Sequence, residues 1–122
     1  MSQVALWCAV GAVGGLGAIL RFTIDGQICR HVGGRFPLGT LGVNLSGAAL
    51  LGGVAGAGLG SRALLVLGTG LLGSYTTFST WMLETHGQVE GGGLAAGTIN
   101  VVGSLLLGLA VAALARLIAH TL

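Results

Sequence analysis

The sequence predicts an all-α membrane protein in which four transmembrane helices, the third of them broken, form a single domain over residues 1–122. Four apolar windows each approach the ~20 residues with which a helix crosses a bilayer. Hydrophobic residues make up 53% of the chain and charged residues only 7%, whereas a soluble domain has about 25% charged residues. A cluster of hydroxyl side chains interrupts the third window between Gly73 and Trp81.

The apolar windows extend roughly over 4–24, 38–58, 63–83 and 94–118. Because the connections between them are short, consecutive spans are expected to run in opposite directions within one bundle. A transmembrane β-barrel would need repeated ~10-residue segments of alternating polarity, and the chain has no such alternation. The windows therefore predict helices.

The few charges are spread almost evenly over the two sides of this bundle. A net charge of +2 comes from residues too scattered to form a nucleic-acid footprint. One side carries Arg62 and Arg116. The other carries Arg30 and Arg35, with Arg21 near its boundary. Since an excess of Lys and Arg usually fixes orientation, so weak a bias predicts insertion both ways, and two opposed copies can pair about a two-fold axis in the membrane plane.

Small residues recur at four-residue intervals, and 25 residues of the chain are Gly. Such stripes let helices approach closely in lipid, so we expect them to form packing seams. The stripes are Gly11 and Gly15 in the first window, Thr40, Asn44, Ala48, Gly52, Gly56 and Gly60 in the second, and Asn100, Ser104, Gly108 and Ala112 in the fourth.

The interruption of the third window is the leading candidate site. Non-helical backbone at membrane depth persists only where it is buried or lines a cavity. Gly73 lets the backbone leave helical geometry and turn carbonyl oxygens toward a common point, and such oxygens suit hard cations. The hydroxyl side chains that follow are Thr76, Thr77, Ser79 and Thr80.

Two aromatic residues follow the interruption. Phe78 and Trp81 are three residues apart and share a face once the helix resumes. Ring edges carry partial positive charge, so these edges, together with amide N–H groups and hydroxyls, form a lining that accepts a small anion without a formal charge. The alternative is that both rings pack or face lipid.

Polar residues inside the other windows have two interpretations. Asn44 and Asn100 each make an interhelical hydrogen bond or face a pathway. For Asn44 we favour the pathway, because Thr40 lies one turn away on the same face. Ser104, one turn after Asn100, bonds its own helix backbone or joins a polar track.

Charged residues near the window ends have two interpretations as well. Arg21 snorkels to the interface or forms an electropositive vestibule that concentrates anions. Glu84 is an interfacial acid or a site residue. No nucleophile with its base and no phosphate-binding loop occurs in the sequence, so we do not expect an enzyme. A passive channel, a small ion-coupled transporter and a packing subunit remain.

Three segments follow one another along the chain: 14–22 (GGLGAILRF), 39–44 (GTLGVN) and 73–80 (GSYTTFST), the last followed by Glu84. In order and spacing they resemble the signature blocks of the CrcB/Fluc fluoride channels, and the resemblance covers nearly the whole chain. It implies a dual-topology antiparallel dimer in the cell membrane. Two parallel pores in that dimer would let fluoride leave the cytoplasm passively.

The resemblance also implies roles for individual residues. A structural sodium ion would be held at the break by the backbone carbonyls of Gly73 and Thr76 from both subunits. The expected ion pathway consists of Asn44, Phe78, Trp81, Ser104, Thr40, Thr77 and Arg21.

The chain departs from the family pattern at four positions. Ser74 and Tyr75 replace Gly-Leu, Trp81 replaces a second Phe, and Asn100 stands where a Tyr is often found. Because some members of the family pair with an unlike chain, half of a heterodimer is one alternative. A small four-helix multidrug transporter is the other, although that family depends on a Glu in its first span and this first window has no acid.

Overall fold

The computed structural model describes residues 2–33 and 36–122, and within these ranges every regular element is helical. The elements are α1 (Gln3–Val32), α2 (Leu38–Gly56), α3 (Ser61–Leu64), the π-helical segment η1 (Leu65–Leu72), α4 (Gly73–Tyr75), α5 (Ser79–Glu90) and α6 (Leu94–Thr121). The all-α prediction is confirmed. Arg35, which entered the charge count, lies outside the described residues.

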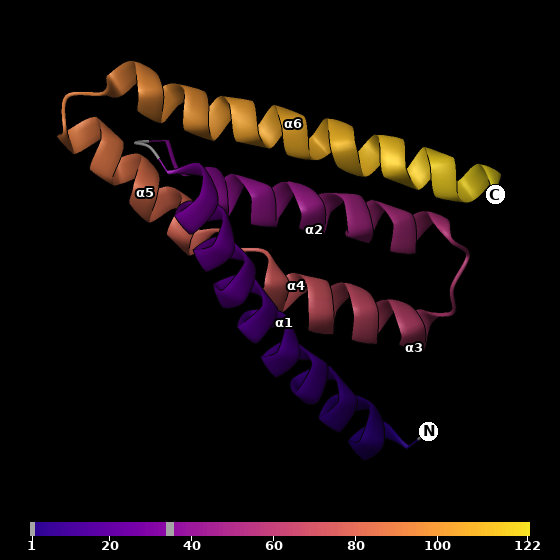
Figure 1. Cartoon of the computed structure of the whole chain (residues 1–122). Helices are drawn as coiled ribbons and strands as arrows, with labels where there is room; N and C mark the ends of the chain where they lie inside the picture. The colour runs from indigo at the N-terminus through magenta and orange to yellow at the C-terminus, as the bar shows by residue number, and fades with distance from the viewer. Residues whose placement is uncertain (1, 34–35) are drawn as a thin grey trace.

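Three helices in the described part of the chain are long and apolar enough to cross a membrane, namely α1, α2 and α6. The third apolar window is divided between the α3–η1–α4 segment and α5. α2 and α6 run side by side in the same direction, and the divided segment runs back in the opposite direction, with α3 and α4 on the other side of α2 from α6 (Figure 1). The break therefore divides the third apolar window, whereas the other three windows each form one continuous helix.

The first helix is longer than its apolar window. We expected a span ending near residue 24, but α1 continues to Val32. Asp25 and the polar residues after it still have helical propensity, and the first residue that ends the helix is Gly33. Gly33 has a φ of 55°, a positive value that glycine adopts at low cost, and its N–H donates to the Cys29 carbonyl at 3.3 Å.

Glycine makes the seam between α2 and α6, which lie side by side (Figure 1). A β-carbon on Gly52 would collide with the carbonyl oxygen of Ala112, and one on Gly56 would collide with that of Arg116. Because both obstacles are backbone atoms, neither can rotate away. The predicted seam is confirmed at Gly52 and Gly56, whereas a β-carbon on Gly60 or Gly108 of the same stripes would meet nothing within 4 Å among the described residues.

The seam expected from Gly11 and Gly15 is wrong within this chain. No described atom lies within 4 Å of a β-carbon built at either position. α1 instead crosses η1 and α4 through Gly14 and Gly17, and a β-carbon on Gly17 would collide with the Leu71 carbonyl oxygen. The contacting row is spaced by three residues rather than four, because the crossing uses the other ridge of the helix.

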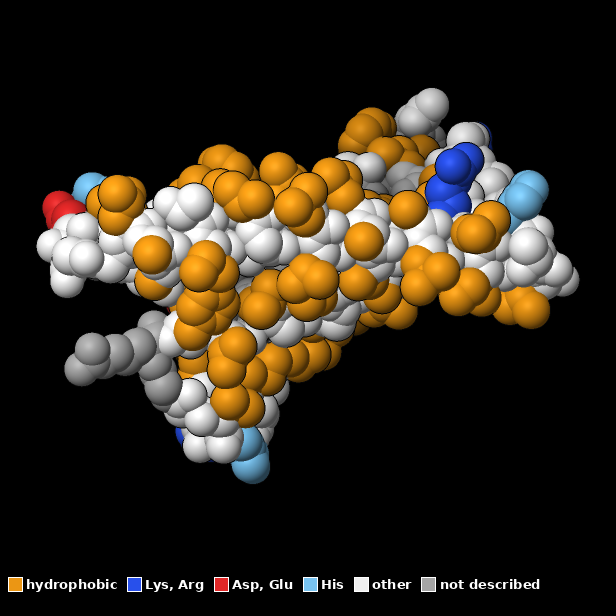
Figure 2. Space-filling view, turned by 90° about the horizontal axis from the view of Figure 1, so that it is seen from above, with side chains coloured by type: hydrophobic (Ala, Val, Ile, Leu, Met, Phe, Trp, Pro, Cys, Tyr) orange, Lys and Arg blue, Asp and Glu red, His pale blue; other side chains and the backbone are white. Residues whose placement is uncertain are grey.

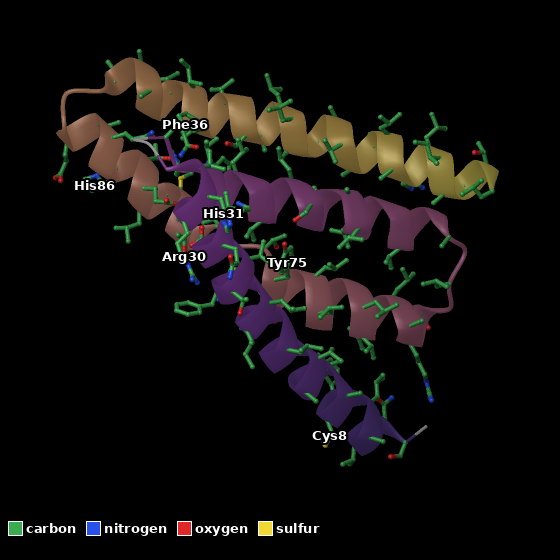
Figure 3. All side chains as sticks on the ribbon, in the orientation of Figure 1. Cys8, Arg30, His31, Phe36, Tyr75 and His86 are labelled. Atoms are coloured by element: carbon green, nitrogen blue, oxygen red, sulfur yellow. The ribbon has the colours of Figure 1, made fainter. Side chains whose placement is uncertain are left out.

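The buried apolar core is small, and most large apolar side chains lie outside. Val43, Leu72 and Tyr75 form the cluster of buried residues, with Tyr75, at the end of α4, between that helix and the middle of α2 (Figure 3). In Figure 2 hydrophobic side chains cover the middle of the visible face, and charged and His side chains gather at its extremities. An apolar band with polar ends suits a bilayer.

Candidate functional site

The break occupies residues 76–78, a shorter stretch than the expected one. α4 ends at Tyr75 and Thr76 is extended, with φ of −79° and ψ of 162°. α5 begins at Ser79. Gly73, where we expected the chain to leave the helix, is helical, with φ of −62° and ψ of −34°. That expectation is wrong, because glycine permits a break but does not impose one.

Asn44 on α2 holds the break through the backbone of Thr77. Its Nδ2 donates to the Thr77 carbonyl at 2.9 Å, and its Oδ1 accepts from the Thr77 N–H at 2.9 Å. In a continuous helix that N–H would donate to the carbonyl of Gly73. The side-chain amide of Asn44 therefore replaces a helix turn, and one of its two N–H bonds is left for other partners.

At the start of α5, a side chain again replaces a backbone group as a hydrogen-bond partner. The N–H of Thr80, which would donate to the Thr76 carbonyl in a continuous helix, donates instead to the Thr77 Oγ1 at 3.2 Å. Gly73 and Thr76 are thus the two residues whose carbonyl oxygens lose their helical donors to side chains. These are the same two carbonyls that were expected to hold a cation.

A groove of about 350 Å³ runs beside the break, between α2 and α6. Five of the seven expected pathway residues line it, namely Asn44, Thr77, Phe78, Trp81 and Ser104. The two rings meet edge to face, with centroids 5.8 Å apart and planes at 87°, and the Phe78 side chain is 70% exposed. The prediction that the two rings share a face is confirmed.

The other two expected residues, Arg21 and Thr40, line a separate cavity of about 190 Å³. Thr77 lines both hollows, so it lies where they adjoin. Asp25 also lines the smaller cavity, which places one charged side chain of each sign there. The seven residues therefore form two groups joined at Thr77.

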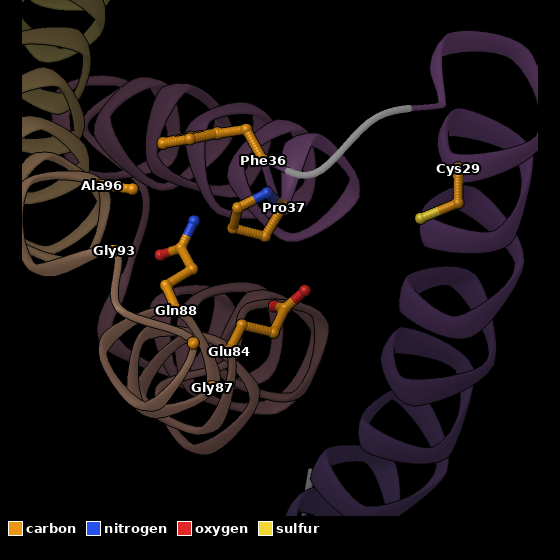
Figure 4. Close-up of a pocket in the computed structure, with 9 residues that line it drawn as sticks. Cys29, Phe36, Pro37, Glu84, Gly87, Gln88, Gly93 and Ala96 are labelled. Carbon is orange, nitrogen blue, oxygen red and sulfur yellow. The ribbon is translucent and has the colours of Figure 1, made fainter.

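Thr40 is also hydrogen-bonded to an acid. It is 3% exposed, and its hydroxyl donates to the Glu84 Oε1. Glu84 in turn lines another cavity of about 680 Å³, larger than the groove, with Cys29 on α1 and Gln88 on α5 also around it (Figure 4). None of the seven expected pathway residues lines this cavity, so size alone does not locate the site.

Trp81 is attached to α6 through its indole nitrogen, which donates to the Asn100 carbonyl at 3.1 Å. The Asn100 side chain donates to the Thr85 Oγ1 at 2.8 Å and accepts from the Ser104 hydroxyl at 3.4 Å. Asn100 is 1% exposed. Of its two interpretations, the structure supports the interhelical hydrogen bond.

Metal ligation by side chains is not indicated. Within residues 2–33 and 36–122, no group of three or more His, Cys, Asp or Glu side chains is arranged to hold a metal ion. Any cation at the break would rely on backbone oxygens, which suit hard ions.

Comparison with known proteins identifies the family. The family model described as "CrcB-like protein, Camphor Resistance (CrcB)" matches residues 8–116. The chain belongs to the CrcB family. A CrcB relative from Mycolicibacterium paratuberculosis, "Fluoride-specific ion channel FluC 2", is 50% identical over 120 residues, which cover 98% of each chain.

Two further CrcB relatives are similar over most of their length. "Fluoride-specific ion channel FluC 2" of Mycobacterium tuberculosis is 49% identical over 96% of this chain and 93% of its own. "Fluoride-specific ion channel FluC 1" of Rubrobacter xylanophilus is 47% identical over 80% of each chain.

The four departures from the CrcB pattern lie around the break. The buried Tyr75 packs with Val43 and Leu72, and its hydroxyl lies 2.8 Å from the Ser46 Oγ. Sequence analysis missed Ser46. Its position among other small residues does not indicate that its hydroxyl contacts Tyr75, 29 positions away. The departures at 81 and 100 contact one another directly through the indole nitrogen.

Proposed function

We propose that this chain is a fluoride-selective passive channel of the cell membrane, and not an enzyme. The observation that carries the proposal is the groove beside the break, where Asn44, Phe78 and Trp81 meet. Ring edges, one amide N–H and hydroxyls offer partial positive charge. The names of the similar CrcB relatives give the anion as fluoride.

The pathway has two parts. Fluoride collects in the cavity of Arg21 and Thr40, passes Thr77, and runs along the edges of Phe78 and Trp81. Conduction needs sites weak enough to release the ion, and uncharged donors meet that need. Ser104 lines the far wall, with its O–H donated to the Asn100 Oδ1.

The third apolar window supplies a fourth, bent crossing in this proposal. α3, η1, α4 and α5 together run back along α2 (Figure 1). The non-helical backbone at its centre is bound by Asn44, as backbone at membrane depth must be.

A second copy in the opposite orientation completes the channel. The even distribution of Arg supports two orientations, and the groove is open along one side. Tags on the C-terminus should label on both faces of the membrane, and strictly one-sided labelling would contradict this part of the proposal.

A sodium ion at the two-fold axis fits the residues present. The carbonyls of Gly73 and Thr76 would hold it, since the N–H groups that normally occupy them donate to Asn44 and to Thr77. Such an ion would join the two breaks through charge attraction. Exchanging sodium for choline should lower the thermal stability of the purified dimer, whereas equal stability in both salts argues against the site.

An unlike partner is the second candidate for the dimer. The CrcB relatives carry the printed numbers 1 and 2, which is consistent with more than one such chain in an organism. The small multidrug transporter is not supported, because the chain belongs to the CrcB family and its first window has no acid before Asp25.

Fluoride efflux from liposomes that contain only this protein tests the proposal, with chloride efflux as the control. We expect fluoride to leave and chloride to remain. Efflux that appears only when a homologous chain is added would establish the heterodimer, and absence in both cases would exclude the channel.

A further inference from the structure

Asn100 lies behind the groove rather than in its wall. It is 1% exposed, and the groove is lined instead by Trp81 and Ser104, both of which it contacts. A buried amide without partners is costly, and here both ends of the side-chain amide are bonded. Asn100 is therefore placed to orient groove residues without touching the ion.

The contacts of Trp81 form a closed ring through Asn100 and Thr85. The indole N–H donates to the Asn100 carbonyl at 3.1 Å, and the Asn100 Nδ2 donates to the Thr85 Oγ1 at 2.8 Å. The Thr85 hydroxyl then donates to the Trp81 carbonyl at 2.8 Å. Trp81 is thus held at its backbone and at the nitrogen of its ring.

We propose that Asn100 is a positioning residue that keeps the indole N–H of Trp81 bonded to α6, so that the ring presents a C–H edge to the ion pathway. The inference rests on the proposed fluoride channel. An indole N–H is a full hydrogen-bond donor, and in the groove it would hold fluoride more tightly than a ring edge does. Because an ion must leave as readily as it enters, withholding that donor favours conduction.

The same orientation supports the ring pair. Phe78 and Trp81 meet at 87° with centroids 5.8 Å apart, a geometry that aromatic pairs prefer. Rotation of the indole to free its nitrogen would break this contact as well as the bond to Asn100. Because the indole bonds the backbone carbonyl of Asn100, the Asn100 side chain acts on Trp81 indirectly. It ties α6 to α5 through Thr85, and this keeps that carbonyl within reach of the indole.

The test compares Asn100→Leu in two backgrounds. Both carry Trp7→Phe, since the chain has 2 Trp, and one also carries Trp81→Phe. Asn100→Leu should lower fluoride efflux from liposomes about tenfold when Trp81 is present, a typical size for the coupling of contacting residues. In the Trp81→Phe background the same substitution should change efflux less than about twofold.

Trp81 fluorescence gives a readout that does not depend on transport. With Trp81 as the sole tryptophan, Asn100→Leu should shift its emission maximum and lower its anisotropy. Thr85→Val removes the hydroxyl between the two residues and should act in the same direction, so the test survives if Asn100→Leu does not fold. Thr98→Val, on the exposed face of α6, is the control and should change neither readout.

The outcomes separate the two proposals. Equal loss of efflux in both backgrounds, or unchanged Trp81 emission, would show that Asn100 is merely structural and would overturn the positioning role. No fluoride efflux from the unsubstituted protein would instead overturn the channel on which the inference rests.

Discussion

The α2–α6 seam and the break in the third window are built by opposite means. At the seam, Gly52 and Gly56 let backbone meet backbone, with no side chain between. At the break, the side chain of Asn44 takes up backbone groups that the helix gives up. Lipid offers no hydrophobic drive between helices, so close packing makes the scaffold and hydrogen bonds shape the site. Substitutions should therefore affect stability at the seam and transport at the break.

The largest loss of stability is expected at the seam. Gly52→Val would press a β-carbon against the Ala112 backbone, which cannot rotate away, so the cost should reach the upper end of the ~1–3 kcal/mol typical of overpacking. Thermal unfolding in detergent measures it. Gly53→Val is the matched control, because no described atom lies within 4 Å of its β-carbon. Similar melting of the two variants would contradict the seam.

The second-largest loss of stability is expected from removing the clamp at the break, by which we mean the two hydrogen bonds between the Asn44 side chain and the Thr77 backbone. Asn44→Leu removes two hydrogen bonds to Thr77, worth about 2 kcal/mol together, and should abolish fluoride efflux because the break loses its shape. Efflux and unfolding are measured on the same preparation. Normal efflux with a lowered melting temperature would mean that the clamp is only structural.

The hydroxyl of Tyr75 should have a smaller effect. Tyr75→Phe removes the contact with Ser46 and should cost about 1 kcal/mol. The cost stays low because Ser46 keeps its bond to the Val43 carbonyl at 3.0 Å. Chemical unfolding checks this, with Ser46→Ala as the partner variant. A loss of several kcal/mol would place the pair among the main supports of the break.

The smallest change of stability is expected at Phe78, where substitution should nevertheless abolish transport. Phe78 is 70% exposed, so Phe78→Ile should alter stability by less than about 0.5 kcal/mol. It should nevertheless abolish fluoride efflux, because the polarised ring edge is lost. Size-exclusion chromatography should give the same elution volume as for the unsubstituted protein. Selective efflux by this variant would remove Phe78 from the pathway.

Periodicity was enough to predict the elements made by repeated small contacts. The apolar windows predicted α1, α2 and α6. The stripe through Gly52 and Gly56 predicted a packing seam but not that α6 is the helix it meets. The row through Gly11 and Gly15 was misleading, because two ridges of one helix carry small residues and only one of them meets η1. Spacing along a helix does not say which ridge is used.

Contacts between residues that are far apart in the chain could not be predicted from the sequence. The hydroxyl cluster located the break within a few residues. Gly73 was taken as the cause of the break, but the break is held by Asn44, which lies 33 positions from its partner Thr77. The bond from the Trp81 indole to the Asn100 carbonyl involves a backbone acceptor. A backbone group is present at every position, so no residue type marks it.

The clamp at Thr77 binds main-chain atoms only. Part of what holds the break therefore lies on a different helix from the one that breaks, while the bond to the Thr80 N–H uses the Thr77 hydroxyl. The side chains of Ser74, Tyr75 and Trp81 take no part in these two bonds. The chemistry of the groove lining can therefore be changed without removing the clamp that shapes it.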